Sequence, residues 1–378
     1  MLKVMTIVGT RPELIKMSRV IAELDRHFEH VLVHTGQNYD YELNQVFFDE
    51  LEIRKPDHFL DAAGETASQT IAQVIAKTEP LLASERPDVV LLYGDTNSCL
   101  AVIPAKRRKI PVFHMEAGNR CFDQRVPEEL NRKVVDHLSD INLVLTEHAR
   151  RYLIAEGIRP ETIIKTGSHM REVLDYYRPK IEASDVITRL SLESGKYFLV
   201  SVHREENVDT PESLADLLET LQALVEKYAF PVIVSTHPRT RKRLEALGHK
   251  ALDPRIVFSK PFGFLDYIRL QMGAFCILSD SGTITEEASL LDLPAVTLRN
   301  AHERPEGMDV GTLVMCGLKK ARVLDAVAMV TGQGVGGGRV VMPVADYENP
   351  AVSKQVARVV SSYVDYVRRT VWGGGVAN

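Results

Sequence analysis

The sequence has few of the features that mark disulfide-rich or membrane proteins. Its 378 residues include only four cysteines, Cys99, Cys121, Cys276 and Cys316, which lie far apart and form no CxxC pair. This spacing indicates reduced thiols, mostly in the core of a cytoplasmic protein. No apolar run reaches the length of a membrane span, and the N-terminal MLKVMTIVGT is too short for the apolar core of a signal peptide. We therefore expect no membrane partner.

Charge and motifs argue against nucleic acid and metal. The net charge is −5, which does not favour nucleic acid or an anionic membrane as a partner. The basic segments 105–109 and 239–245 are interpreted as solvated helix faces. No HExxH or similar ligand spacing indicates a metal site. GxxxxGK[ST] is absent, and a GxGxxG at Gly332, Gly334 and Gly337 follows a helix and precedes a strand, the reverse of a dinucleotide site.

Short apolar segments alternate with amphipathic ones along most of the chain. Helices are expected at 15–25, 67–82 and 130–138. Val- and Ile-rich strands separated by helices predict parallel sheets that are covered on both faces. The expected strands are 3–8, 30–35, 88–95, 110–116, 141–145, 162–167, 196–203, 231–237, 255–260, 275–280, 294–299 and 339–343.

The length of the chain is too great for one core, so two domains are expected. The two sets of strands predict an α/β protein with two Rossmann-like, doubly wound domains, separated by the polar stretch 176–185. We expect an N-terminal domain of residues 1–170 plus about 358–378, and a C-terminal domain of residues 171–357. The helical pattern at 350–370 would pack back on the first domain.

Unusual polar residues follow the expected strands. In doubly wound sheets ligands bind beyond the carboxyl ends of the strands, so this pattern predicts a polar ligand in a cleft between the domains. The segments are Gly9–Glu13, Gly94–Thr96, His114 with Glu116, His203–Asn207, His237–Arg239 and Ser279–Thr283.

Two of these segments suit a phosphate group. SDSGTITEEASL at 279–290 combines a strand end, a Ser-Gly turn and a helix start, whose free amides bind anions, although plain helix capping explains it equally well. Arg11 lies in a tight turn where its fork could clamp a diphosphate. His203 leaves a strand within a run of charges, which favours a ligand contact over a core histidine.

The motifs together resemble one known family. GTRPELIKM, YGDTNS, HMEAGNR…VPEELNR, VSVHREEN, STHP, SDSGTITEEAS and ERPEGMDVGT are similar, in this order, to the non-hydrolysing UDP-N-acetylglucosamine 2-epimerases. The resemblance implies a GT-B type of fold, a homodimer, a UDP-sugar substrate and inversion of C2 without a cofactor.

The resemblance also implies roles for individual residues. Catalytic or substrate roles fall on Asp95, Glu116, Glu128 and His203, with Lys16 near the sugar. Contacts to UDP or the substrate fall on Arg11, His203, Tyr267, Ser281, Gly282, Glu287 and Arg304.

Two segments depart from the common family form. The segment between Glu116 and Glu128 is shorter, with Asn119 where leucine is usual, and the stretch 35–45 differs from the form that serves a second, allosteric UDP-sugar site. These variants resemble the subgroup that makes UDP-N-acetyl-L-fucosamine from UDP-2-acetamido-2,6-dideoxy-L-talose for capsule or O-antigen. UDP-N-acetylglucosamine is the alternative substrate.

The chemistry of this reaction explains the charged stretch 114–132, HMEAGNRCFDQRVPEELNR. If UDP leaves C1, the hydrogen on C2 becomes acidic, so one carboxylate can remove it and another acid can return a proton to the opposite face. Glu116 and Glu128 are the candidates, and Asp95 is a third. Glu129 could be only a helix-start charge, and Arg120 or Arg132 could keep a catalytic carboxylate ionised.

Three other functions fit parts of the pattern. A GT-B glycosyltransferase shares the fold and the UDP site but transfers the sugar to an acceptor. A hydrolysing epimerase releases free UDP. A nucleotide-sugar sensor binds UDP and tolerates the loss of every carboxylate named above.

Overall fold

The structure, a computed structural model, describes residues 1–36, 48–208, 210–236, 252–301, 303–334 and 339–373. Its contacts divide the chain into two compact units, residues 1–176 with 346–378, and residues 177–345. The first boundary between the units, after residue 176, lies inside helix α7 (Met170–Glu182), whereas the expected boundary was at residue 170. The second boundary, after residue 345, lies before helix α16 (Val352–Trp372), whereas it was expected near residue 358. The segments 239–245 and His237–Arg239, and Gly337 of the GxGxxG pattern, lie outside the described residues.

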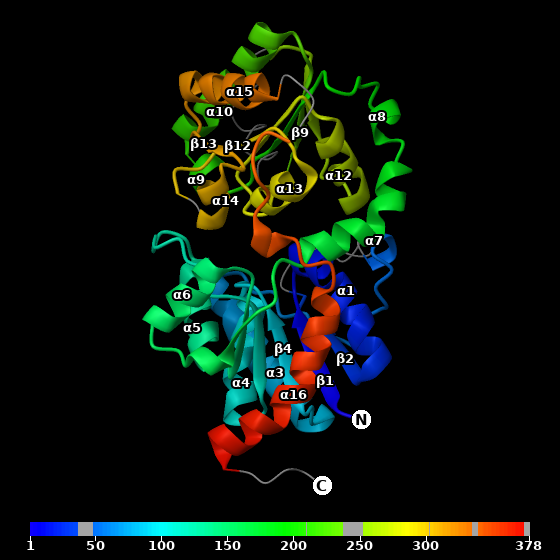
Figure 1. Cartoon of the computed structure of the whole chain (residues 1–378), viewed down its shortest axis with the longest axis vertical. Helices are drawn as coiled ribbons and strands as arrows, with labels where there is room; N and C mark the ends of the chain where they lie inside the picture. Colours follow the sequence, from blue (N-terminus) through cyan, green and yellow to red (C-terminus); the bar gives the residue numbers. More distant parts are fainter. Residues whose placement is uncertain (37–47, 209, 237–251, 302, 335–338, 374–378) are drawn as a thin grey trace. The chain divides into compact units, whose positions relative to one another are not determined.

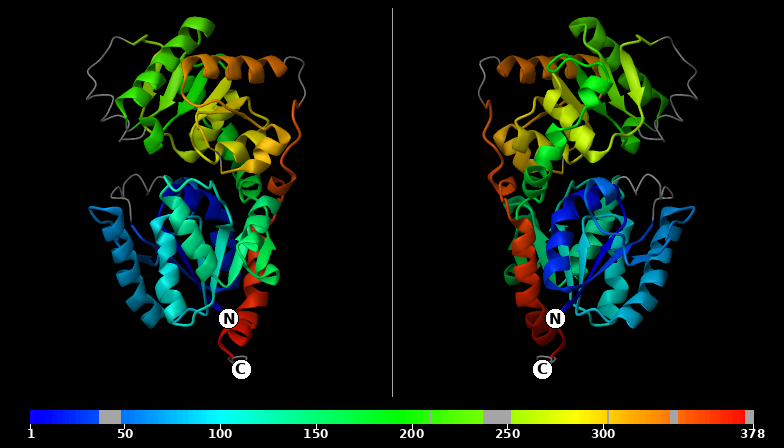
Figure 2. Two further views of the ribbon diagram at one scale, coloured as in Figure 1. Left: turned by 90° about the vertical axis from the view of Figure 1, so that its left-hand side faces the viewer. Right: turned by 90° about the vertical axis from the view of Figure 1, so that its right-hand side faces the viewer.

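Unit 1 is built on a seven-stranded sheet in which every strand pair is parallel, in the order β3-β2-β1-β4-β5-β6-β7. Helices α1 and α16 pack together on one face, and α3, α4 and α5 lie on the other (Figures 1 and 2). The strands are β1 (Lys3–Val8), β2 (Glu29–His34), β3 (His58–Phe59), β4 (Val89–Tyr93), β5 (Val112–Ala117), β6 (Ile141–Val144) and β7 (Ile163–Lys165). The helices, besides α7 and α16, are α1 (Arg11–His27), α3 (Ala67–Glu85), α4 (Val102–Arg107), α5 (Glu128–Leu138), α6 (Glu147–Ala155) and the 3-10 turns Asn97–Ala101, Pro160–Thr162 and Ala345–Tyr347.

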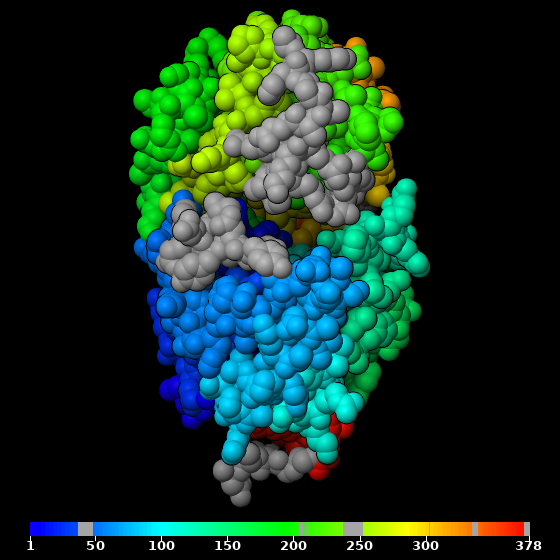
Figure 3. All heavy atoms as spheres, turned by 180° about the vertical axis from the view of Figure 1, so that it is seen from behind, coloured from blue at the N-terminus to red at the C-terminus, as the bar shows by residue number. Residues whose placement is uncertain are grey.

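Apolar residues on both faces of the sheet explain these layers. Met5 and Ile7 of β1 and Val90 and Leu92 of β4 are buried, and Val74 of α3 joins the same cluster. On the outside, the segment that contains α3 (light blue) forms much of the surface seen from behind in Figure 3. Helix α16 turns its own apolar stripe inward, so that it closes the other face of unit 1.

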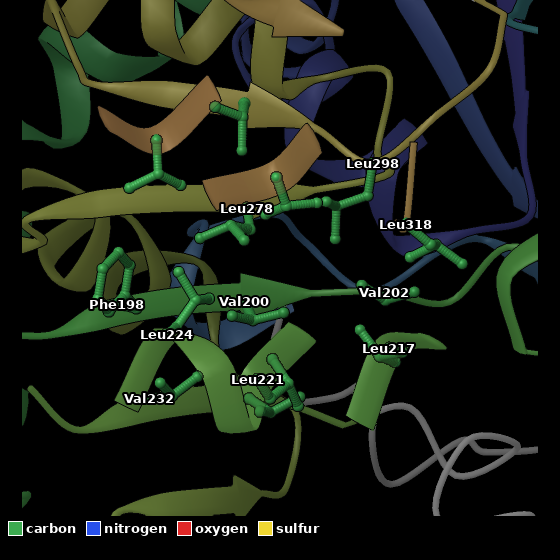
Figure 4. Close-up of a cluster of buried hydrophobic side chains, with 14 of the residues drawn as sticks. Phe198, Val200, Val202, Leu217, Leu221, Leu224, Val232, Leu278, Leu298 and Leu318 are labelled. Carbon is green, nitrogen blue, oxygen red and sulfur yellow. The ribbon is translucent and has the colours of Figure 1, made fainter. Parts of the chain in front are cut away.

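Unit 2 repeats the plan with a six-stranded parallel sheet in the order β10-β9-β8-β11-β12-β13. Its core lies between the sheet and helices α10 and α15 (Figure 4). The strands are β8 (Phe198–Ser201), β9 (Val232–Ser235), β10 (Ile256–Ser259), β11 (Cys276–Ser279), β12 (Ala295–Thr297) and β13 (Val314–Met315). The helices are α8 (Val186–Arg189), α9 (Glu205–Val208), α10 (Pro211–Tyr228), α12 (Phe264–Gly273), α13 (Ile284–Leu291), α14 (Pro305–Val310) and α15 (Lys320–Gln333).

The α/β class with two doubly wound parallel sheets is thus confirmed. Eleven of the expected strands are present with small shifts at their ends, but the strand expected at 339–343 is wrong. That segment lies against α13 instead, where Arg339 donates to the Ser289 carbonyl and the Val344 amide donates to Ser289 Oγ. The two-residue strands β3 and β13 were not expected, because they are too short to show a pattern.

In each unit the strand order reverses beside the first strand, between β1 and β4 and between β8 and β11. Ligands of doubly wound sheets bind at the carboxyl ends of such strands. All four cysteines are thiols. No helix among the described residues is long and apolar enough to cross a membrane.

Candidate active site

The turn between β1 and α1 is tightly built. Gly9 is required, because a Cβ at this position would lie 2.0 Å from Ser98 Oγ and 2.3 Å from Thr35 Oγ1. Thr10 and Glu13 form a capping box, in which Glu13 accepts hydrogen bonds from the amides of Gly9 (2.5 Å) and Thr10 (3.2 Å). The turn therefore presents the partly buried Arg11 on a fixed backbone.

Glu13 also joins this turn to the next strand. Its other carboxylate oxygen accepts a hydrogen bond from Thr96 Oγ1 (2.5 Å), just beyond β4. Burial, together with the nearby charge of Asp95, raises the pKa of Glu13 to about 7, although its hydrogen bonds act in the opposite direction. Glu13 was not among the predicted site residues.

Glu116 stands at an irregular point of β5. Its φ of +64° lies in the left-handed region, which is strained for a glutamate, and the pairing with β6 shifts between Met115 and Ala117. The bulge turns the carboxylate toward Lys16 Nζ of α1, at 2.7 Å, and toward the hydroxyl of Tyr93 at the end of β4, which donates to it. The Lys16 and Glu116 side chains are 5% and 12% exposed. The structure thus brings together two predicted site residues and adds Tyr93.

Asp95 follows β4 and is paired with helix α5. Arg132 donates from Nε to Asp95 Oδ2 at 2.8 Å, and from Nη1 to Glu129 Oε2 at 3.0 Å. Asn131 donates to the Asp95 carbonyl at 2.9 Å. The expectation that Arg132 supports a predicted catalytic carboxylate therefore agrees with its position. Glu129 is 2% exposed and has a structural contact, so it is more than a charge at a helix start.

Arg120 does not contact any of the predicted catalytic carboxylates, because its partners are other acids. It is fully buried and lies 2.7 Å from both Asp136 and Glu156. Asp136 also accepts from His114 Nδ1 (2.8 Å), while His114 Nε2 donates to the Gly94 carbonyl (2.7 Å). Burial opposes the ionisation of Asp136, but the hydrogen bonds and charges of His114 and Arg120 hold its pKa below the usual value. This network supports the backbone before Asp95.

Glu128 is the first residue of α5 and is partly exposed. Among the described residues, it makes no hydrogen bond or ion pair with another side chain. Its carboxylate is thus available to a ligand, unlike that of its neighbour Glu129.

In unit 2 a single buried carboxylate organises the loop after β8. Asp280 accepts hydrogen bonds from the amides of His203 (3.1 Å) and Arg204 (3.0 Å) and from Asn207 Nδ2 (3.0 Å). The His203 ring lies with Nδ1 3.1 Å from Asp280 Oδ1 and remains 45% exposed. Asp280 therefore fixes the predicted site residue His203 at the end of the strand. Asp280 lies within a predicted phosphate motif but was not itself among the predicted site residues.

The Ser281–Gly282 turn leads into α13. Ser281 Oγ lies 3.1 Å from Thr283 Oγ1 and accepts weakly from the Thr283 amide at 3.4 Å. Thr283 is the N-cap residue, but its side chain makes no capping hydrogen bond to the helix. A Cβ built on Gly282 would have Glu303 Oε2, at 3.5 Å, as its nearest described neighbour. The amide end of a helix preceded by an open glycine turn suits an anion.

The remaining predicted residues of unit 2 fall into two groups. Gln271 donates to Glu287 at 2.6 Å, and burial beside Glu287 raises the pKa of Tyr267. Arg304 lies 3.4 Å from the fully buried Glu286 instead. Tyr267 and Glu287 are thus neighbours, as a common role at a nucleotide would require, whereas Arg304 belongs to a separate ion pair.

Comparison with known proteins identifies the family. The model of the family described as UDP-N-acetylglucosamine 2-epimerase matches residues 22–361. The chain belongs to this family. It is therefore an isomerase, and the resemblance of its motifs is confirmed at this level.

Solved members of the epimerase family share the fold over almost the whole chain. The structure of UDP-N-acetylglucosamine 2-epimerase from Rickettsia bellii is 60% identical, covers 99% of this chain and 100% of its own, and gives a TM-score of 0.93. The Methanocaldococcus jannaschii UDP-GlcNAc 2-epimerase in complex with UDP-GlcNAc and UDP is 33% identical, covers 95% and 99% of the two chains, and gives a TM-score of 0.88.

A relative with another named substrate is also similar. The UDP-2,3-diacetamido-2,3-dideoxy-D-glucuronate 2-epimerase of Pseudomonas aeruginosa is 33% identical over 359 residues, which cover 92% of this chain and 99% of that protein. Family membership therefore identifies a UDP-sugar 2-epimerase, and the relatives differ in the sugar that their names give.

Proposed function

We propose that this epimerase inverts C2 of a UDP-2-acetamido sugar by eliminating UDP and then adding it back. The observation that carries the proposal is the buried contact between Lys16 and Glu116 at the carboxyl ends of the unit 1 strands. An ammonium group at 2.7 Å stabilises the ionised form of a carboxylate, which is the form that removes a proton.

The elimination route follows from the chemistry of the sugar. C2 carries an amide nitrogen and no carbonyl, so its hydrogen is barely acidic. When the C1–O bond breaks, the electron pair leaves with UDP and C1 becomes cation-like. A base then takes the C2 proton, and the C1–C2 double bond of a 2-acetamidoglycal forms. Re-addition of UDP at C1, with a proton delivered to the opposite face of C2, gives the epimer.

The carboxylates of unit 1 are assigned to the proton transfers. Glu116 is the candidate base, and Glu128 or Asp95 supplies the acid on the other face. Positioned general acids and bases contribute about 10²–10⁴-fold each.

The residues of unit 2, with Arg11, are assigned to the nucleotide. The diphosphate gains negative charge as the bond breaks, so donors fixed in advance stabilise the transition state. His203, the amides at Ser281–Gly282 and the α13 terminus are assigned as such donors, and of the two amides that of Ser281 also donates to Ser279 Oγ at 3.1 Å. Tyr267 and Glu287 are assigned to the uridine, and Arg304 to the substrate.

We propose UDP-2-acetamido-2,6-dideoxy-L-talose as the substrate, with UDP-N-acetyl-L-fucosamine for capsule or O-antigen as the product. The support is the short segment between Glu116 and Glu128. That segment follows the candidate base Glu116 in the chain, so its shortening would reshape the sugar site to suit a 6-deoxy sugar. UDP-N-acetylglucosamine is the second candidate, because the two solved relatives named above carry that activity in their names.

Solvent isotope incorporation tests the mechanism. In D₂O the product should gain one deuteron at C2, because the acid on the opposite face carries a deuteron from solvent and delivers it to C2. Product without deuterium at C2 would rule out the elimination.

NMR of the products from both UDP-sugars, without an acceptor, tests the substrate. Accumulation of free UDP would instead indicate a hydrolysing enzyme, and an absence of epimer would favour a transferase.

We also propose that the protein acts as a homodimer in the cytoplasm, as the family resemblance implies. Light scattering of the purified chain tests the oligomeric state, and a monomeric mass at working concentration would contradict it.

A further inference from the structure

The segment 119–127 is tied to the predicted catalytic carboxylate Asp95 by one buried side chain. Glu129 accepts hydrogen bonds from the amides of Cys121 (3.2 Å) and Phe122 (3.3 Å) and from Cys121 Sγ (3.3 Å). The same carboxylate accepts from Arg132 Nη1 at 3.0 Å.

Arg132 continues this connection on its other edge. Its Nε donates to Asp95 Oδ2 at 2.8 Å, so one guanidinium bridges two carboxylates. The Arg132 and Glu129 side chains are 6% and 3% exposed, and that of Asp95 is 25% exposed. A buried bidentate arginine holds its partners in a narrow range of geometry. Asp95 therefore takes its position from Arg132, and Arg132 takes its position in turn from Glu129.

Glu129 is well suited to this role chemically. Burial opposes its ionisation, but the Cys121 amide and thiol and the Arg132 charge hold its pKa below the usual value. The ionised carboxylate can accept from the loop amides and from Arg132 at once. Phe122, whose amide it binds, has a φ of +56°, a left-handed conformation that needs such support.

We propose that Glu129 is a positioning residue. Its carboxylate holds Arg132 against Asp95 and also binds the backbone amides of residues 121 and 122. The proposal rests on the role of Asp95 in the proposed function. It assigns to the second glutamate of VPEELNR a task different from that of the first, Glu128.

Substitution of Glu129 gives the first test, in the full-length chain with whichever of the two UDP-sugars it epimerises. Glu129→Gln keeps the shape but cannot hold Arg132 by charge, so we expect kcat to fall on the order of 10²-fold with a small change in KM, since small misplacements of catalytic groups cost this much. Glu129→Asp should recover part of the loss. Glu172→Gln is the matched control. Glu172 accepts from the Ser353 amide (2.8 Å) and hydroxyl (2.5 Å) in the same unit, so this variant should lower Tm and leave kcat unchanged.

A double-mutant cycle with Arg132→Lys provides a readout that a purely structural role would not change. A lysine cannot bridge both carboxylates, so Glu129→Gln should cost much less in that background than in the wild type. Additive losses would overturn the inference, as would a Glu129→Gln enzyme with wild-type kcat. If Asp95→Asn keeps full turnover, the role of Asp95 in the proposed function fails. If only Asp95→Asn loses turnover, the inference about Glu129 alone fails.

Discussion

The two units share a strand order, but the turn after the first strand is stabilised by a different kind of contact in each unit. In unit 1 a buried carboxylate of the following helix, Glu13, accepts the amides of Gly9 and Thr10 after β1. In unit 2 the equivalent acceptor for the amides of His203 and Arg204 is Asp280, which follows the neighbouring strand β11. One fold thus stabilises the same turn by a local or by a distant carboxylate.

The residues around these turns differ as well. In unit 1 the nearby acids are paired with cations, as Glu116 is with Lys16 and Asp95 with Arg132. In unit 2 an open glycine turn and a helix start directly follow Asp280, the residue that holds the histidine. Paired carboxylates suit proton transfer and the N-terminus of a helix suits an anion, so the comparison indicates a division of tasks between the units.

The largest expected effect is in unit 1. Glu116→Gln should lower kcat by about 10²–10⁴-fold, because the candidate base is removed. Binding of UDP, measured by calorimetry, should not change. Glu147→Gln, a substitution on the surface helix α6 of the same unit, is the control and should have wild-type kcat. Near wild-type turnover of Glu116→Gln would contradict the assignment of Glu116 as the base. Weaker UDP binding by this variant would contradict the division of tasks between the units.

The next effect is in unit 2. Asp280→Asn removes a charged acceptor of three hydrogen bonds, so the loop that carries His203 should loosen. Hydrogen bonds to charged groups contribute about 1.5–3 kcal/mol each, so the Kd for UDP should rise roughly 10–100-fold. Calorimetry measures this effect, and circular dichroism checks that the unit remains folded. An unchanged Kd in a folded variant would separate His203 from the nucleotide.

Glu13 should make the stability of the protein depend on pH. Its pKa is raised from 4.5 to about 7 in the folded chain, so the folded state binds the proton more tightly than the unfolded state. Stability should therefore be lost as pH rises from about 4.5 to 7, by on the order of 3 kcal/mol from this group. Glu13→Gln should flatten that part of the profile in urea unfolding at pH 5 and 8. Identical slopes for variant and wild type would contradict the prediction.

The smallest effect is expected at the glycine turn. Ser281→Ala removes one hydroxyl and leaves the backbone amides, so KM should rise only about 2–10-fold, as for one neutral hydrogen bond. A loss as large as that of Asp280→Asn would mean that the hydroxyl, rather than the amides, binds the ligand.

Local patterns in the sequence predicted most of the fold. Apolar runs bounded by polar residues gave the central strands of both sheets, because these strands are buried on two sides. The edge strands β3 and β13 are too short to carry such a signal. The apolar run at 339–343 looks like a strand in the sequence, but Val340 and Met342 are 47% and 73% exposed, and the run pairs with neither sheet of the described residues.

Contacts in the candidate site could be predicted where both partners lie in the same short sequence motif. The spacing of Thr10 and Glu13 signals a capping box, so the role of Glu13 could have been found locally. Asp280 accepts hydrogen bonds from residues more than seventy positions earlier, and Arg120 forms its ion pair with Asp136 rather than with a catalytic candidate. These pairings depend on how distant segments pack together, so no single segment of the sequence predicts them.

The return of the chain to unit 1 through α16 has a consequence for biosynthesis. Val356, Val360 and Val364 of α16 are buried and the helix contacts α1, so an apolar face of the first unit stays uncovered while the ribosome makes the whole of the second. Unit 2 is continuous and can collapse as soon as it emerges. The half that was begun first is therefore the half that is completed last.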